Sequence, residues 1–365
     1  EGLIIELGDS NDFIQIIENN ISAINIPAGG QAMFNSIHIK PASHMINGST
    51  VSLQYFYTSI NGFSGENYIT MSVGTRDEDD PMGPDEYGYY IYDSGDLTYP
   101  LVPVYDWIEI TGAGGGQNFN FTDTGDGCYS SGGGWYGCND LEGEDTQVLQ
   151  LPFIFQFYGI QYDEITVSTN GWIAFGDREM SAFRNYSIPG AGGPSPMVAA
   201  FWDDLTTDNG GDVYYLTTDD YVIIQWDEMR IHDHGSQENT FQMIIYNPAN
   251  PEHLTQTGDG EIKIQYKDFN NISDGDYNQY TPLHGCYSTT GIENHLGNIG
   301  LEYSFDNNNP VEAMTLDDET AIFITTSLGY TYTLGDVNQD DELNVLDVVT
   351  TVNFILGVLE PTAYQ

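Results

Sequence analysis

Between residues 151 and 327 the chain alternates short apolar stretches with turn residues, and this pattern restricts its fold more than any other feature. Nine strand-length segments follow one another, each bounded by Gly, Asn, Asp or Pro: LPFIFQFYG, YDEITVSTNGWIAFG, PMVAAFWDDL, GDVYYL, DYVIIQWDEMRI, NTFQMIIYNP, GEIKIQYKDF, GNIGLEYSF and TAIFITTS. No helical pattern lies between them, and parallel strands need long crossover connections that are usually helical. The pattern therefore predicts an antiparallel β-sandwich or jelly roll.

The first hundred residues predict a second, smaller sandwich. Val51, Leu53, Tyr55 and Tyr57 lie on one face of a predicted strand, and the strand NYITMSVG follows a glycine-containing turn. The acidic, proline-containing stretch TRDEDDPMGPDEYG then indicates a boundary or an exposed loop.

The composition supports a mostly β fold, because 26 Tyr and 41 Gly among 365 residues suit short strands joined by turns. The length is enough for two or three domains. We expect a β-sandwich over 1–103, a larger antiparallel sandwich over 104–328, and a short C-terminal loop and helix over 329–365.

Acidic residues dominate the charge: 55 Asp and Glu stand against 7 Lys and Arg, a formal net charge of -48. Such a surface repels nucleic acid. It also repels itself unless cations screen or bind it, and divalent ions that prefer oxygen ligands, calcium above all, do this best. A solvated acidic surface in a saline habitat would give the same composition, so the charge leaves both explanations open.

Export is the expected destination. No run of about 18 apolar residues occurs, which predicts no membrane-spanning helix. The chain begins at Glu1 rather than Met, as expected of a processed piece of a longer precursor. We expect a secreted, extracellular or cell-surface protein.

The C-terminal stretch GDVNQDDELNVLDVVTTVNFILG has the spacing of a calcium loop. Positions 1, 3, 5, 7, 9 and 12 of that loop are Asp336, Asn338, Asp340, Glu342, Asn344 and Asp347. The first three side chains can converge on one ion, the seventh residue offers its backbone carbonyl, and the twelfth enters the following helix. Apolar residues then recur at helical spacing, so loop and helix form one folding unit. The alternative is an acidic cap before an amphipathic helix.

Three further acidic pairs lie in turn-like stretches and are candidates for additional calcium sites: Asp123 and Asp126, Asp208 and Asp212, and Asp274 and Asp276. Each lacks the full loop spacing, and a solvated turn is the default interpretation.

Cys128 and Cys138 flank the glycine-rich stretch YSSGGGWYG, where a disulfide would close a short loop and leave Cys286 unpaired. The other pairings and three free thiols stay open.

No catalytic arrangement is evident, and we expect no enzyme. Asp203 and Asp204 are adjacent in FWDDL, and adjacent residues of a strand point to opposite faces. His232 and His234 could share a face but lack an evident third ligand for a transition metal. Two acids that converge from different strands, as in glycosidases, remain the alternative.

The order PFxFxFYG, ITVSTNGWIAFG, FWDDL, GDVYY and NTFQMIIY resembles the nidogen-type extracellular β-domain over about residues 105–327. That resemblance implies a structural and binding module without catalytic residues. The terminal stretch, about 335–357, resembles a type I dockerin repeat, whose helix binds a cohesin partner. It departs from that pattern in having Asp341 where Gly is usual and in being a single repeat.

The first hundred residues resemble the immunoglobulin-like modules of surface proteins, in which one or two strands usually precede the equivalent of EGLIIELGDSNDFIQII. This chain begins within that strand, so its sheet could be short by a strand and open to strand addition. We hypothesise a subunit of an extracellular assembly or filament, with head-to-tail contacts through its termini and joints made rigid by calcium. Its partners would be other copies of itself or a cohesin-like or surface scaffold protein. The alternative is a monomeric accessory module of a secreted peptidase or glycoside hydrolase, anchored by the dockerin-like tail.

Overall fold

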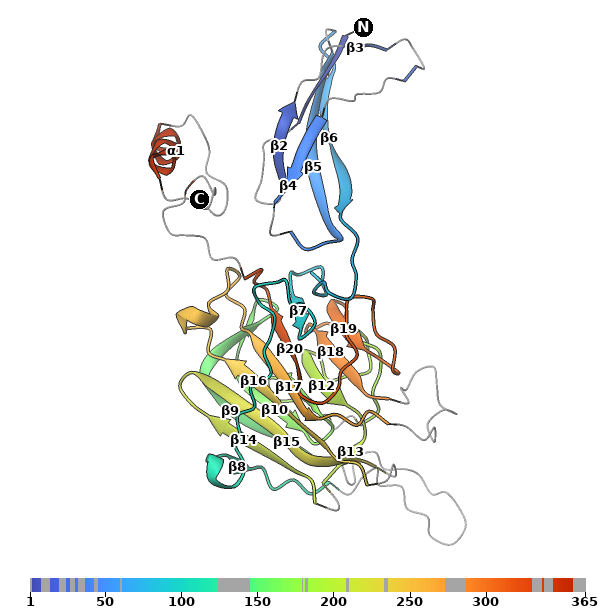
Figure 1. Ribbon diagram of the computed structural model, residues 1–365, viewed down its shortest axis with the longest axis vertical. Coiled ribbons are helices and arrows are strands. Elements are labelled where there is room, and N and C mark those ends of the chain that lie inside the picture. Colours follow the sequence, from blue (N-terminus) through green and yellow to red (C-terminus); the bar gives the residue numbers. More distant parts are fainter. Residues whose placement is uncertain are drawn as a thin grey trace. The chain divides into compact units, whose positions relative to one another are not determined.

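The structure is a computed structural model. It describes residues 2–7, 14–19, 24–26, 30–31, 37–42, 45–59, 61–123, 145–178, 180, 183–207, 210–232, 236–272, 287–329, 337 and 344–356. In these residues the chain is mostly β, as predicted, with one α-helix, α1 (Val345–Ile355) (Figure 1). Two compact units divide the chain: residues 76–328 form one, and residues 1–75 together with 329–365 form the other.

The larger unit contains two antiparallel sheets, which lie as two layers in Figure 1. The first has the order β19-β18-β12-β11-β10-β9. Its strands are β9 (Thr146–Phe157), β10 (Ile160–Ser168), β11 (Trp172–Phe175), β12 (Met197–Trp202), β18 (Thr289–Glu293) and β19 (Gly300–Ser304). The second has the order β7-β20-β17-β16-β15-β14-β8, and β13 also pairs with β15. Its strands are β7 (Tyr90–Asp93), β8 (Gln117–Asn118), β13 (Leu205–Thr206), β14 (Asp212–Thr217), β15 (Tyr221–Ile231), β16 (Asn239–Tyr246), β17 (Ile262–Asp268) and β20 (Thr320–Thr325).

The core lies between these sheets and is rich in aromatic side chains. Phe201, which follows Ala200 in β12, contacts Phe241 of β16 with ring centroids 5.7 Å apart, and Trp226 stacks on Phe241 at 5.0 Å. All six residues of β12 are buried, so this strand is covered on both faces. Such packing explains why the predicted strand segments read as continuous apolar runs.

Two details of the larger unit differ from the prediction. The segment YDEITVSTNGWIAFG forms two strands, β10 and β11, because the chain reverses at Gly171. Gly171 has φ +75, and a β-carbon there would collide with the carbonyl oxygen of Phe201. Strand β18, TTGIE, was not predicted at all.

The predicted boundary between residues 103 and 104 is not where the chain divides. The division falls at Thr75, and β7 pairs with β20 through Asp93↔Ile322 and Tyr90↔Thr325. Ile91 is only 1% exposed, so the apolar strand YIYD belongs to the core of the larger unit. The acidic stretch before β7 is the boundary, and the strand after it begins the larger unit.

In the smaller unit, residues 1–75 form one sheet of order β3-β1-β5-β6 and a second sheet of β2 and β4. The strands are β1 (Gly2–Leu7), β2 (Ile14–Asn19), β3 (Ile24–Asn25), β4 (Ile37–Pro41), β5 (Ser49–Ser59) and β6 (Ser64–Val73). Ile14 of β2 packs against Val51 and Leu53 of β5, which are buried as their alternation predicts. Strand β6 lies at one edge, and within the described residues it pairs with β5 alone.

Candidate functional site

The start of α1 brings together two positions of the predicted calcium loop, Asn344 and Asp347. Asn344 is the N-cap, and its side chain accepts a hydrogen bond from the Leu346 N–H at 2.7 Å. Asp347 accepts the Asn344 N–H through Oδ2 at 2.7 Å and the Val337 N–H through Oδ1 at 2.9 Å. Asp347 is 4% exposed, so one buried carboxylate ties the helix to a residue ten positions earlier in the chain. Such capping-box contacts fix the entry of the chain into a helix.

The remaining loop positions, Asp336, Asn338, Asp340 and Glu342, lie outside the described residues. The twelfth position, Asp347, is buried, and its carboxylate bonds the backbone N–H groups of Val337 and Asn344.

Most of the side chains on α1 are exposed and apolar. Val345, Val348 and Ile355 are 68%, 60% and 77% exposed, and Leu346 is 52% exposed. Asp347 is the buried residue of this helix. A helix with this surface is a candidate for docking against another protein.

Of the other calcium candidates, Asp123 and Asp212 are described. Asp123 is 1% exposed: its carboxylate accepts the Thr169 hydroxyl, and its carbonyl oxygen accepts the hydroxyls of Thr206 and Thr207 at 3.0 Å. Asp123 therefore links its own segment to Thr169, Thr206 and Thr207. Asp212 opens β14 and accepts the Tyr214 hydroxyl at 3.3 Å. Asp126, Asp208, Asp274 and Asp276 lie outside the described residues, as do Cys128 and Cys138.

The carboxylates of Asp203 and Asp204, which follow β12, have different partners. Oδ1 of Asp203 accepts the Asp204 N–H at 2.9 Å, and Oδ2 of Asp204 lies 3.7 Å from Nδ1 of His232. Burial raises the pKa of Asp203 to about 8; the Asp204 N–H lowers that pKa and the Asp204 charge raises it. His234 lies outside the described residues. Within the described chain, no three or more His, Cys, Asp or Glu side chains are grouped so as to hold a metal ion.

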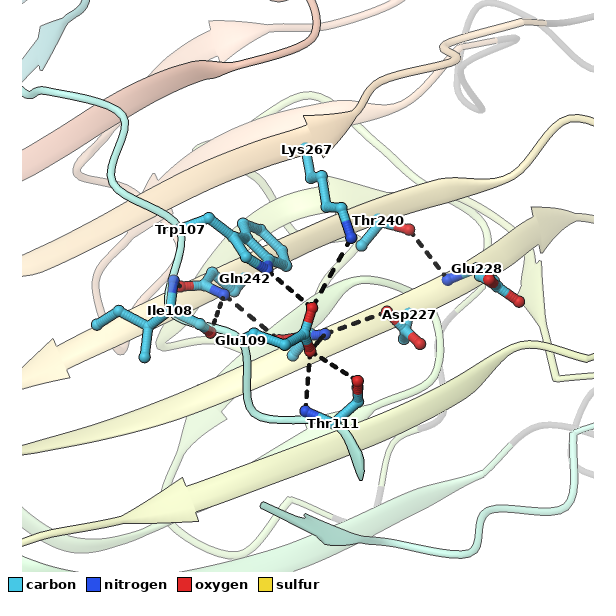
Figure 2. A network of polar contacts seen from close by, with 10 residues as sticks. Trp107, Ile108, Glu109, Thr111, Asp227, Glu228, Thr240, Gln242 and Lys267 are labelled. Carbon is cyan, nitrogen blue, oxygen red and sulfur yellow. Dashed lines mark hydrogen bonds and ion pairs between the residues drawn. The ribbon is translucent and has the colours of Figure 1, made fainter. Parts of the chain in front are cut away.

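A more extensive polar network joins the segment 104–111, here called the strap, to the face of the eight-stranded sheet (Figure 2). Gln225, Gln242 and Gln265 are register neighbours on β15, β16 and β17, and each is 0% exposed. Gln265 accepts the Asp106 N–H at 2.6 Å and donates to the Asp106 carbonyl at 2.9 Å. Gln242 makes the same pair of bonds with Ile108, at 3.4 and 3.1 Å. Each of these two side-chain amides thus bonds both the N–H and the C=O of one strap residue.

The strap is closed at its end by Glu109. This carboxylate accepts the hydroxyl and N–H of Thr111 at 2.7 and 2.9 Å, and it lies 3.8 Å from Nζ of Lys267, which sits over the Trp107 ring (Figure 2). Partial burial alone would raise the pKa of Glu109, but hydrogen bonds from Thr111, Gln225 and Trp107 lower it to about 2. Glu109 therefore stays ionised as an acceptor for the strap.

Comparison with known families decides what this sandwich is. Residues 118–334, more than half of the chain, match the protein family described as NIDO related. The chain belongs to the nidogen-related family. The match confirms the nidogen part of the resemblance seen in the sequence. No solved structure matches the chain.

Nidogen-related domains are typically extracellular and generally non-catalytic. None of the described helices has the length and apolarity needed to cross a membrane. The stretch that resembles a dockerin repeat, about 335–357, follows the matched range, and the first hundred residues precede it.

The glutamines of the nidogen-related domain were missed in the sequence, although a signal was present. Each stands inside an apolar strand, in IIQWD, TFQMI and KIQYK. A polar residue with that placement needs a buried partner. The partner is the strap, which precedes the matched range.

Proposed function

We propose that this protein is a non-enzymatic, calcium-stabilised structural or adhesive subunit of an extracellular assembly, in which copies contact one another head to tail through their terminal regions. The nidogen-related domain supports the extracellular, non-catalytic part. The observation that carries the calcium part is the buried Asp347, which joins Val337 to the N-cap of α1 in a stretch with the spacing of a calcium loop.

Calcium binding would neutralise part of a net charge of -48 where acidic side chains are densest. In the proposed loop, Asp336, Asn338 and Asp340 supply side-chain oxygens, the Glu342 carbonyl adds a fourth ligand, and Asp347 closes the shell. Asn344, the N-cap of α1, contributes at position 9. Binding and formation of α1 would then be coupled, because loop and helix share Asp347.

Two surfaces support contacts between copies. Strand β6 gives a ten-residue edge, and an exposed edge can pair with a strand from another chain. Helix α1 offers exposed Val and Ile side chains. Contacts between two different surfaces build a ring if the rotation between copies closes and an open filament if it does not, and we propose the filament.

Electron microscopy and sedimentation velocity of the full chain test this function, with calcium and with a chelator. The variant Asp336→Asn/Asp340→Asn removes two loop ligands. The control Asp219→Asn/Asp220→Asn removes the same charge from exposed residues between β14 and β15. We expect filaments of the wild type and the control in calcium, and monomers of the loop variant or in chelator. A wild type that stays monomeric in calcium, at concentrations well above physiological, would exclude the filament.

A wild type that stays monomeric would leave the second candidate to be tested: a monomeric accessory module of a secreted peptidase or glycoside hydrolase. The exposed apolar surface of α1 favours it, because a tail of that kind can dock on a cohesin-like scaffold protein. Binding of the isolated monomer to such a scaffold, lost in the loop variant, would support this candidate.

A further inference from the structure

Two acidic segments lie side by side at the start of the larger unit: 77–80, with the sequence DEDD, and 93–96, with the sequence DSGD. Tyr99 joins them, since its hydroxyl donates to Oδ1 of Asp80 at 2.5 Å and its N–H donates to the Asp96 carbonyl at 3.0 Å. A β-carbon on Gly95 would lie 3.8 Å from the carbonyl oxygen of Glu78. All of these residues precede the matched range 118–334.

The carboxylates of this cluster are buried: Asp80, Asp93 and Asp96 are 3%, 1% and 0% exposed. Both carboxylate oxygens of Asp93 accept hydrogen bonds. Its Oδ1 accepts the Gly95 N–H at 2.7 Å, and its Oδ2 accepts the Tyr303 hydroxyl at 2.8 Å and the Met314 N–H at 3.0 Å.

Asp96 is different. Its Oδ2 accepts the Asp93 N–H at 2.8 Å, but its Oδ1 is buried and has no hydrogen-bond partner among the described residues. An ionised carboxylate oxygen in that state is costly. Burial raises the pKa of Asp96 to about 8; the Asp93 N–H lowers this pKa, and the charges of Asp93, Asp80 and Asp79 raise it. Among the described residues, the charges that act most on Asp96 are negative, and either a proton or a bound cation would neutralise it.

We propose that Asp96 and Asp93, with Asp80 and the Glu78 carbonyl beside them, form a buried site for a divalent cation with the oxygen preference of calcium. Calcium accepts six to eight oxygens at variable geometry, including backbone carbonyls and water. Since no three acidic side chains of the described chain are grouped closely enough to hold a metal alone, carbonyl and water oxygens complete the shell. One ion offsets several carboxylates at once, which a single proton on Asp96 does not. The residues of this site all belong to the larger unit, whereas the terminal loop belongs to the smaller unit.

Terbium luminescence sensitised by tyrosine tests the site, because the hydroxyls of Tyr99 and Tyr303 bond two of its carboxylates. The experiment uses the full chain carrying Asp336→Asn/Asp340→Asn, so that the terminal loop is silent, in moderate salt to suppress diffuse binding. We expect saturable emission that calcium competes away. Adding Asp96→Asn should weaken terbium binding at least tenfold, whereas adding Asp219→Asn, an exposed acid, should leave it unchanged.

Asp96→Asn keeps an oxygen that can accept the Asp93 N–H, and Asp80→Asn provides a second variant should the first unfold. Emission that is saturable and insensitive to both variants would overturn the proposal. An absence of saturable emission in the loop-silent chain, with Asp96→Asn as stable as its parent in calcium, would show that a proton neutralises Asp96 and would equally overturn it. Either result leaves the terminal loop and the proposed function unaffected.

Discussion

At the scale of single residues, buried amides and carboxyls of the larger unit form hydrogen bonds with backbone groups, which apolar side chains cannot do. Gln242 satisfies both backbone groups of Ile108, and Gln265 satisfies both of Asp106. The burial of these glutamines was predictable from their place inside apolar strands, but their hydrogen-bond partner was not, since periodicity separates buried from exposed residues and says nothing of the partner that a buried amide will find.

Replacing Gln242 by Leu should lower the free energy of unfolding by about 2–4 kcal/mol, because the N–H and C=O of Ile108, in the strap, lose their hydrogen-bond partner. Chemical denaturation of the full chain measures this change. Gln161→Leu, an exposed glutamine of β10, is the matched control and should change stability by less than about 0.5 kcal/mol. Equal effects of the two substitutions would contradict the role given to the glutamines.

Asp203 predicts a pH dependence. Its folded pKa is raised to about 8, so the folded state holds a proton that the unfolded state releases above its ordinary value near 3.8. Stability should therefore fall as pH rises from about 4 to about 8, by up to about 1.4 kcal/mol per pH unit from Asp203. Asp203→Asn should reduce this slope in denaturation experiments with excess chelator and leave the part that Asp96, whose pKa is also raised to about 8, contributes, while Asp177→Asn, an exposed acid, should preserve it. An unchanged slope in Asp203→Asn would show that another group titrates.

At the scale of elements, the strands that the sequence predicted are those with continuous apolar runs, such as β12, β15 and β16. Strand β18 escaped because TTGIE has one large apolar residue, Ile292. All five of its residues are buried, and the hydroxyls of Thr289 and Thr290 bond the carbonyls of Tyr186 and Ala200 at 3.0 Å. Burial of threonine by hydrogen bonding depends on neighbours distant in sequence, so the local pattern does not reveal it.

The start of α1 was predictable, because Asp347 is both the twelfth position of the loop spacing and part of the stretch with helical periodicity. Asn344→Ala removes the N-cap bond to Leu346, and in chelator it should destabilise α1 by about 1 kcal/mol, or about fivefold in opening. Amide hydrogen exchange across 349–355, where the N–H groups bond within the helix, measures the loss. Asn353→Ala, on the same helix but away from the cap, is the control. Exchange that is equally fast in both variants would mean that Asn344 does not cap the helix.

At the scale of the whole molecule, a charge of -48 makes stability depend on ions. Sodium chloride should raise the midpoint of thermal unfolding gradually, as screening weakens repulsion between acidic side chains. Calcium at matched ionic strength should raise it further, because binding to the folded state adds to screening. Equal midpoints in calcium and in matched sodium chloride would mean that calcium stabilises the protein only by screening, as any salt does.

The central claim is that a calcium ion is held by the terminal loop, and counting bound ions tests it most directly. Equilibrium dialysis of the full chain against calcium, in enough salt to suppress diffuse binding, gives the number of tightly held ions per chain. We predict that Asp336→Asn/Asp340→Asn holds one ion fewer than the wild type and than Asp219→Asn/Asp220→Asn. The same number of ions in all three proteins would contradict the account.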